Sequence, residues 1–257
     1  PPPRLTDPPT PENNTLSLHD ALPISPAPLR PGRPLPYRLR TEVANKKRHG
    51  AIALLEFENV AAGILASDIM VKRSPIALLR CGSIHPGHFL ILVGGSVAST
   101  EEAYAAGMQV GETRNALSGS IFLGDVHPSL HDAVLGNRRK VDGDALAVVE
   151  TYSSPALLAA VDAAVKSTPV ILSEVRLGDD LGGHALALLS GNLFDVETAL
   201  EICSERAGEQ LLAGTLLPRL DSDLRSVLDQ GTRFESCPGW EPAGAEYPEE
   251  VVCSWDA

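Results

Sequence analysis

AIALLEFENVAAGILASDIMVKRSP, residues 51–75, recurs in altered form 94 positions later as ALAVVETYSSPALLAAVDAAVKSTP, residues 145–169. The two stretches align without a gap and keep the same lysine near their ends, Lys72 in the first and Lys166 in the second. The match continues beyond them after a two-residue insertion in the second copy. A period this long that occurs only twice indicates two duplicated domains rather than a solenoid of stacked repeats.

Each copy is predicted to contain four strands, two long helices and a short terminal helix. Apolar runs and helical spacing place these elements in the order strand, helix, strand, strand, helix, strand, helix. In the first copy Ser99 is the expected N-cap of the second helix, with Glu102 at N3. This order predicts an α+β fold: two tandem split-βαβ (ferredoxin-like) domains, each with an antiparallel-mixed sheet and two helices on one face. The expected bounds are 51–57, 60–73, 76–81, 89–93, from about 99, 121–126 and 129–135, and then 145–151, 155–167, 170–176, 184–189, 194–207, 211–217 and 221–229.

The sequence divides into five segments. Residues 1–49 are rich in proline, with 12 of the 21 prolines in residues 1–37, and this density excludes a packed helix or sheet. Residues 15–25 resemble a translated sequencing adapter, so that stretch is not expected to belong to the fold. The other segments are the two repeats, a polar linker and an aperiodic tail, expected at 50–135, 144–230, 136–143 and 231–257.

Composition excludes several classes of function. The net charge of −12 argues against nucleic acid as the main partner, and the longest apolar runs are too short to span a membrane. Four cysteines without a CxxC pair exclude a disulfide scaffold and favour a reducing compartment. The chain lacks a GxGxxG, P-loop, GxSxG or HExxH motif, so we expect no enzyme.

Several motifs recur in both copies in the same order. Each first helix ends in Asp-x-x-Val-Lys, at Asp68–Lys72 and Asp162–Lys166, and a glycine turn at 93–97 or 190–193 precedes each second helix. Together these motifs resemble the bacterial microcompartment (BMC) shell domain. Two unpermuted copies resemble the tandem BMC-T type, as in propanediol-utilisation compartments and single-layer trimers.

This resemblance implies a structural role. A homotrimer would form a flat pseudohexamer, since three chains supply six similar domains to a closed ring. Such tiles pack with other shell proteins into a polyhedral shell in the bacterial cytoplasm, and small metabolites cross it through a central pore. An alternative from the residues alone is a tandem ferredoxin-like regulator that binds a small ligand, because this fold by itself assigns no function.

The resemblance also assigns residues to the tile edge. Lys72 and Lys166 match the family lysine that donates to backbone carbonyls of the next tile, and a compact ammonium with three donors suits this role. Either lysine would equally suit a solvated helix C-terminus. Arg219 matches the family's edge arginine, whereas Ser129 stands at its place in the first copy.

The resemblance implies that the pore lies at the loop between the second and third strands of each copy. Glycines there let the backbone turn sharply near an axis, and a ring of imidazoles and carboxylates would disfavour anions. His85 stands where related proteins place a cluster-binding cysteine, so three imidazoles could hold a metal ion, giving a metal-binding or electron-conduit variant. A solvent-facing His85 with no cofactor is the other interpretation. The pore-lining residues are predicted to be Ser83, Ile84, His85, Pro86 and Gly87, with Gly178, Asp179, Asp180, Leu181, Gly182 and Gly183.

Overall fold

The structure is a computed structural model that describes residues 48–178 and 180–233. The adapter-like stretch, nearly all of the proline-rich segment and the tail from residue 234 lie outside the described residues. The following description concerns the two repeats and the linker between them.

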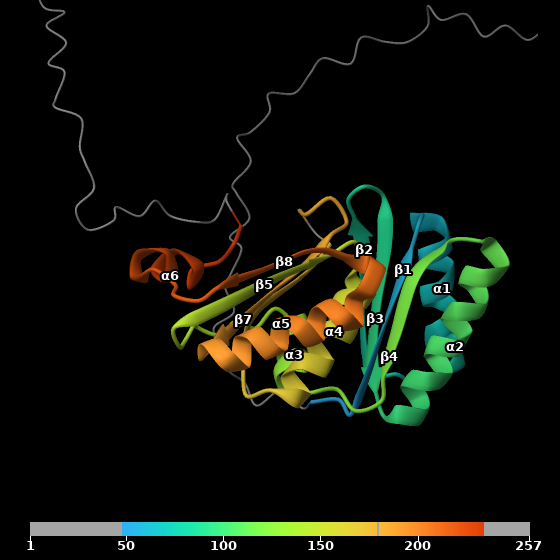
Figure 1. Cartoon of the computed structure of the whole chain (residues 1–257). Coiled ribbons are helices and arrows are strands. Elements are labelled where there is room, and N and C mark those ends of the chain that lie inside the picture. Colours follow the sequence, from blue (N-terminus) through green and yellow to red (C-terminus); the bar gives the residue numbers. More distant parts are fainter. Residues whose placement is uncertain (1–47, 179, 234–257) are drawn as a thin grey trace, which may run out of the picture. The chain divides into compact units, whose positions relative to one another are not determined.

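The first domain contains a four-stranded sheet in the order β2-β3-β1-β4. All neighbouring strands are antiparallel, so the expected mixed sheet is wrong, whereas the split-βαβ order is confirmed. Helices α1 and α2 cover one face of this sheet (Figure 1). The elements are β1 (Ala51–Phe57), α1 (Val60–Arg73), β2 (Leu78–Ile84), β3 (His88–Gly95), α2 (Val97–Arg114), β4 (Leu117–Leu123) and α3 (Pro128–Val134).

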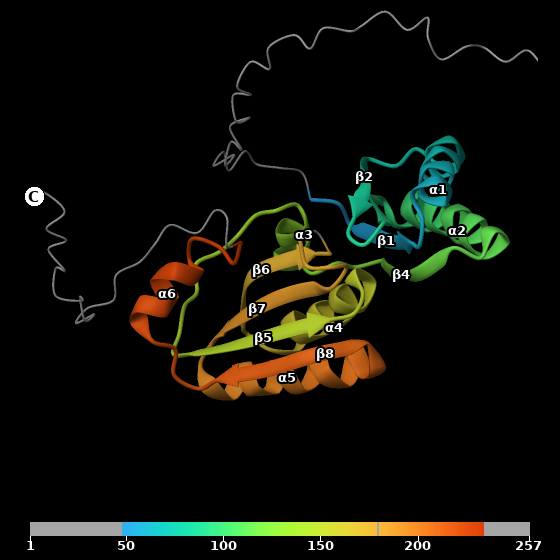
Figure 2. The ribbon, with the colours of Figure 1, turned by 90° about the horizontal axis from the view of Figure 1, so that it is seen from above.

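The second domain repeats this topology, with strand order β6-β7-β5-β8. Helices α4 and α5 cover one face of its sheet (Figure 2). A short 3₁₀ turn η1 (Gly208–Gln210) is added between α5 and β8. The other elements are β5 (Ala145–Thr151), α4 (Ser154–Ser167), β6 (Ile171–Leu177), β7 (Ala185–Gly191), α5 (Leu193–Ala207), β8 (Leu211–Leu217) and α6 (Ser222–Leu228).

The elements differ from the sequence prediction mainly at their ends. Ser96, not Ser99, caps α2, and its hydroxyl accepts the Ser99 N–H at 3.2 Å. Glu102 therefore does not complete a capping box but pairs with Arg73 of α1 at 3.0 Å. Strand β4 begins at Leu117, four residues earlier than expected, and ends before the turn into α3.

The two domains share one apolar core because α4 packs on both sheets. Alternate residues of β1 face opposite ways, so that Ala53 and Leu55 pack under α1 and α2. Ile52 and Leu54 point to the other face and belong to the same buried cluster as α3, α4 and α5. Helix α4 thus lies between its own sheet and the first domain, where it packs against β1 and β4.

Candidate functional site

The apolar part of the domain junction is built on the outer side of α4. Leu158 is 0% exposed and Val165 is also buried, although the residues at the same positions of α1, Ile64 and Val71, are exposed. The first domain covers both buried residues of α4 with β1, β4 and Leu130 of α3. This burial fixes how the second repeat meets the first.

At the start of α4, the junction is polar. Helix α4 has no capping hydrogen bond from its own N-cap residue Ser153. Instead, Glu56 of β1 accepts the backbone N–H of Ser154 at 3.2 Å. The other oxygen of this buried carboxylate lies 2.9 Å from Nδ1 of His88. A carboxylate at a helix N-terminus satisfies an orphan donor and interacts favourably with the helix dipole.

The last turn of α4 also joins the first domain through polar groups. Asp162 accepts the backbone N–H of His127 at 2.9 Å and pairs with Lys166 at 2.6 Å. Lys166 also donates to the backbone carbonyl of Asp125. This predicted edge lysine therefore binds a backbone carbonyl of its own chain, and its side chain is 37% exposed.

Its counterpart Lys72 has a simpler environment. Lys72 pairs with Asp68 of the same helix at 2.6 Å, and its side chain is 74% exposed. Arg219, the third predicted edge residue, is exposed just before α6. The structure does not bring these two residues together within the chain.

The two predicted pore loops do meet each other. Ile84 ends β2 with a buried side chain against Gly178, whereas His85, Pro86 and Gly87 form the exposed turn. Gly183 has a φ of +90°, and a Cβ there would lie 3.0 Å from the His85 carbonyl oxygen. Glycine at this position therefore permits the loops to touch.

The remaining predicted pore residues differ in exposure. Ser83 lies at the end of β2 and is exposed, as are Asp180 and Gly182 of the second loop, while Leu181 is half-buried. Asp179 lies outside the described residues.

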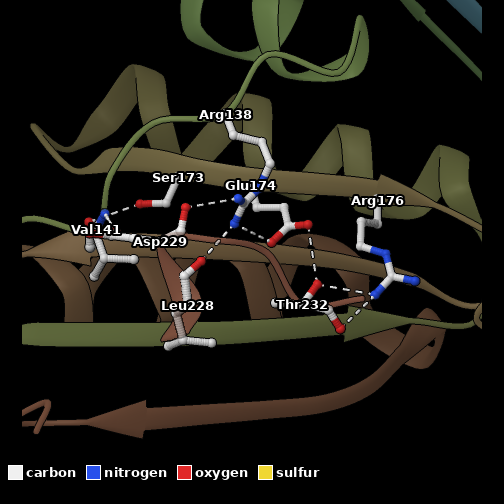
Figure 3. Close-up of polar contacts among 9 residues, drawn as sticks. Arg138, Val141, Ser173, Glu174, Arg176, Leu228, Asp229 and Thr232 are labelled. Carbon is white, nitrogen blue, oxygen red and sulfur yellow. Dashed lines mark hydrogen bonds and ion pairs between the residues drawn. The ribbon is translucent and has the colours of Figure 1, made fainter. Parts of the chain in front are cut away.

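A polar network that the sequence did not predict holds the linker and the C-terminal segment on β6 (Figure 3). Buried Glu174 pairs with Arg138 of the linker at 2.9 Å and accepts the Thr232 hydroxyl at 3.2 Å. Arg176 donates to the same hydroxyl at 3.1 Å. Arg233 then pairs with Asp180, so this segment also anchors the second loop. A glutamate inside an apolar strand is the signal that could have revealed the network, because a buried charge needs a partner.

The cysteines of the two domains differ in environment. Cys81 is exposed on the edge strand β2. Cys203 in α5 is buried, and desolvation raises the pKa of its thiol to about 12. Within residues 48–178 and 180–233, the chain forms no cluster of three or more His, Cys, Asp or Glu suited to a metal ion. In the same residues, no helix has the length and apolarity needed to cross a membrane.

Comparison with known proteins identifies the duplicated unit. The model of the BMC domain matches residues 51–124 and 145–220, one match for each repeat. The chain belongs to the BMC-domain family. It is a tandem BMC-domain shell protein, as the motifs predicted. BMC shell proteins are structural, which confirms the expectation of a non-enzymatic role. Membership of this family also favours a shell protein over the alternative of a ligand-binding regulator.

Individual relatives agree with this family. The bacterial microcompartment shell protein PduT of Citrobacter freundii is 34% identical over 66% of this chain and 92% of its own length. The carboxysome assembly protein CcmO of a Synechocystis strain is 27% identical over 71% of this chain and 65% of its own. A solved microcompartment protein from Desulfitobacterium hafniense DCB has a TM-score of 0.61 and 29% identity, covering 68% of this chain and 98% of that one. The similarity to this chain therefore extends over most of the length of each of these relatives.

Proposed function

We propose that three copies of this shell protein form a closed ring of six BMC domains, a shell tile with a pore on its axis. The observation that carries the proposal is an asymmetry between the two repeats. Two surfaces that are buried at the domain junction, the outer side of α4 and the short helix α3, have exposed duplicates in the other repeat. A second copy of the chain has the matching surfaces to cover them.

The first helices of the two repeats illustrate this asymmetry. Ile64 of α1 is 57% exposed, whereas Leu158, which occupies the same place in α4, is 0% exposed. Val71 and Val165 differ in the same direction. The outer side of α1 is thus an apolar surface without the cover that α4 receives from the first domain.

The complementary surface shows the reverse pattern. Leu130 of α3 is buried against the second domain, whereas its duplicate Leu224 in α6 is 43% exposed. Edge strand β6 packs beside α3, while its duplicate β2 has exposed residues along most of its length. A single chain therefore exposes two complementary surfaces, the outer side of α1 in the first domain and the α6 side of the second domain.

Two different surfaces that complement each other produce a head-to-tail contact, and such contacts form rings when the rotation closes. Repeating the internal junction between chains would place α1 of one copy against the β8 and α6 side of the next. Six domains from three chains would then be equivalent around one axis. The homotrimer of the BMC-T type follows from this arrangement.

The pore and edge residues take their roles from the ring. The touching loops at 83–87 and 178–183 would repeat around the axis and line a passage for small metabolites, with His85 and Asp180 among its exposed polar groups. By the same repetition, Lys72 of one copy would lie beside Arg219 of the next copy, as Lys166 lies beside Asp125 within the chain. We expect this junction to reach the rim of the tile, where other shell proteins would bind. Two relatives, a microcompartment shell protein and a carboxysome assembly protein, support this setting in the microcompartment shell.

The ring is tested by placing a charge on the uncovered helix. Native mass spectrometry and sedimentation of the full chain are expected to give a trimer, and Ile64→Glu is expected to give a monomer. Val97→Glu is the matched control, because Val97 and its duplicate Leu193 are both exposed and so lie outside the junction. A monomeric wild-type chain, or equal effects of the two variants, would overturn the proposal.

A further inference from the structure

We propose that Glu150 of one copy caps helix α1 of the next copy by accepting the backbone N–H of Val60. This contact rests on the proposed ring and specifies one hydrogen bond that closes it. It would repeat between chains the contact that Glu56 makes with Ser154 inside the chain.

The two glutamates occupy the same position in their sheets. Glu56 pairs with Gly119 of β4, and Glu150 pairs with Ala213 of β8, which lie 94 residues apart like the glutamates themselves. In each domain the strand register shifts directly after the glutamate. The shared register gives the two carboxylates the same direction relative to their sheets.

Within one chain, Glu150 lacks the partners that Glu56 has. Glu56 is 1% exposed and binds both Ser154 and His88. Glu150 is half-buried, and no residue in 48–178 or 180–233 forms a hydrogen bond or ion pair with its side chain. Association would bury this carboxylate further, and a donor from the other chain would supply the partner that burial requires.

The start of α1 supplies an equivalent donor. Val60 is the first residue of α1, as Ser154 is of α4. Asn59 accepts the N–H of Ala62 and leaves the Val60 N–H without an acceptor among the described residues. The first N–H groups of a helix have no partner within it, so an anionic acceptor is favoured there.

The histidine beside each glutamate marks a difference between the two contacts. His88 binds Glu56, whereas its duplicate His184 packs edge-on against Tyr152, with ring centroids 5.6 Å apart. Glu150 is therefore left to the neighbouring helix, and the contact between chains depends on a single carboxylate.

Substituting the donor itself tests the contact. Val60→Pro removes the N–H, yet proline is preferred at the first helical position, and Asn59 before it already has the extended φ of −147° and ψ of 150° that proline requires. Val60→Ala controls for loss of the valine side chain. Sedimentation equilibrium of the full chain would give the dissociation constant of the trimer for Val60→Pro, Val60→Ala, Glu150→Ala and the double variant Val60→Pro/Glu150→Ala.

The contact predicts a non-additive result. Glu150→Ala weakens each contact between chains about tenfold, a typical loss for a helix cap. Val60→Pro weakens the contact by a similar factor relative to Val60→Ala, and the double variant is no weaker than the worse single variant. The unfolding midpoint measured below the association range stays at the wild-type value, whereas Glu56→Ala, the internal counterpart, lowers it.

The failures are distinguishable. A trimer that Glu150→Ala leaves unchanged, or additive effects in the double variant, would overturn the cap and leave the ring intact. A wild-type chain that stays monomeric at all concentrations would overturn the ring and the cap together.

Discussion

The two BMC domains of this chain have the same topology but bury opposite surfaces. The second domain buries the outer side of its first helix and leaves α6 exposed, and the first domain buries α3 and leaves the outer side of α1 exposed. The buried pair is joined covalently and forms in every molecule, so it can be built as a continuous core. The exposed pair is left for another copy of the chain to cover. Duplication thus supplies two versions of one interface. The linker holds one version together within each chain, whereas the other forms only between chains.

The largest expected contrast is between the duplicated positions Leu158 and Ile64. Leu158→Ala removes a fully buried side chain from the shared core and is expected to cost about 2–5 kcal/mol of unfolding free energy. Ile64→Ala is expected to leave the unfolding of the dilute chain within about 0.5 kcal/mol, because the residue is exposed there. Urea unfolding at several protein concentrations measures both. Equal losses for the two variants would contradict the asymmetry.

A smaller contrast is expected between Lys166 and Lys72. Lys166→Met removes the cation that faces buried Asp162 and a donor to the first domain, which is expected to cost about 1–3 kcal/mol. Lys72→Met breaks only an exposed pair on one helix, worth about 0.2–0.5 kcal/mol. Methionine keeps the apolar stem in both variants. Chemical unfolding of the dilute chain checks the difference, and a loss at Lys72 as large as at Lys166 would refute it.

Much of the fold could be predicted from the sequence because the repeat is strong locally. The matching stretches at 51–75 and 145–169 carry a buried strand and a helix each, and the bounds of all four elements were predicted to within one residue. The errors lie where two signals compete. Ser96 and Ser99 both suit a cap, and the chain uses the one that follows the strand directly. The small residues at 118–120 resemble a turn, yet Gly119 and Ser120 pair with β1 across the sheet.

The site was predicted only where a resemblance pointed to it. Lys166 was found by its motif, but its partner Asp125 depends on a contact between domains that no local pattern encodes. Glu56 and Ser154 are 98 residues apart, and their hydrogen bond follows from packing α4 on the first sheet. Repetition of the glutamate at Glu150 was visible in the sequence. Its proposed role required the structure, because the two glutamates differ in burial and in bonding partners.

A weaker effect is expected on how the unfolding free energy depends on pH, through Asp132 of α3. A hydrogen bond from Arg48 lowers the pKa of the Asp132 carboxyl at the end of this helix. A pKa lower in the folded state stabilises the fold above the unfolded value, near 3.8, and that stabilisation is lost as pH falls through the folded value. Asp132→Asn is expected to cost about 0.2–1 kcal/mol at pH 7 and less at pH 3, since solvent partly screens the pair. Urea unfolding at both pH values tests this. An unchanged difference between wild type and variant at the two pH values would contradict it.

The smallest effect is expected at Asp221, where the two copies of the interface carry different charges. Asp162 accepts the backbone N–H of His127 inside the chain, and in the ring Asp68 of a neighbouring copy would meet the N–H of Asp221. The Asp221 carboxylate then lies beside a second carboxylate, a repulsion absent from the internal junction. The variant that isolates this charge is Asp221→Asn, because asparagine caps a helix such as α6 about as well as aspartate does.

Removing this repulsion is expected to tighten the trimer about twofold, the size of a like-charge pair on a helix surface. Glu101→Gln, at an exposed position on α2, is the control for the change in net charge. The trimer dissociation constant at low and high salt measures the effect, and the gain is expected to shrink as salt screens the charges. A gain shared by Glu101→Gln would assign it to net charge instead. A tighter trimer for Asp221→Asn alone would mean that the interface between chains contains a repulsion that is absent from the junction within the chain.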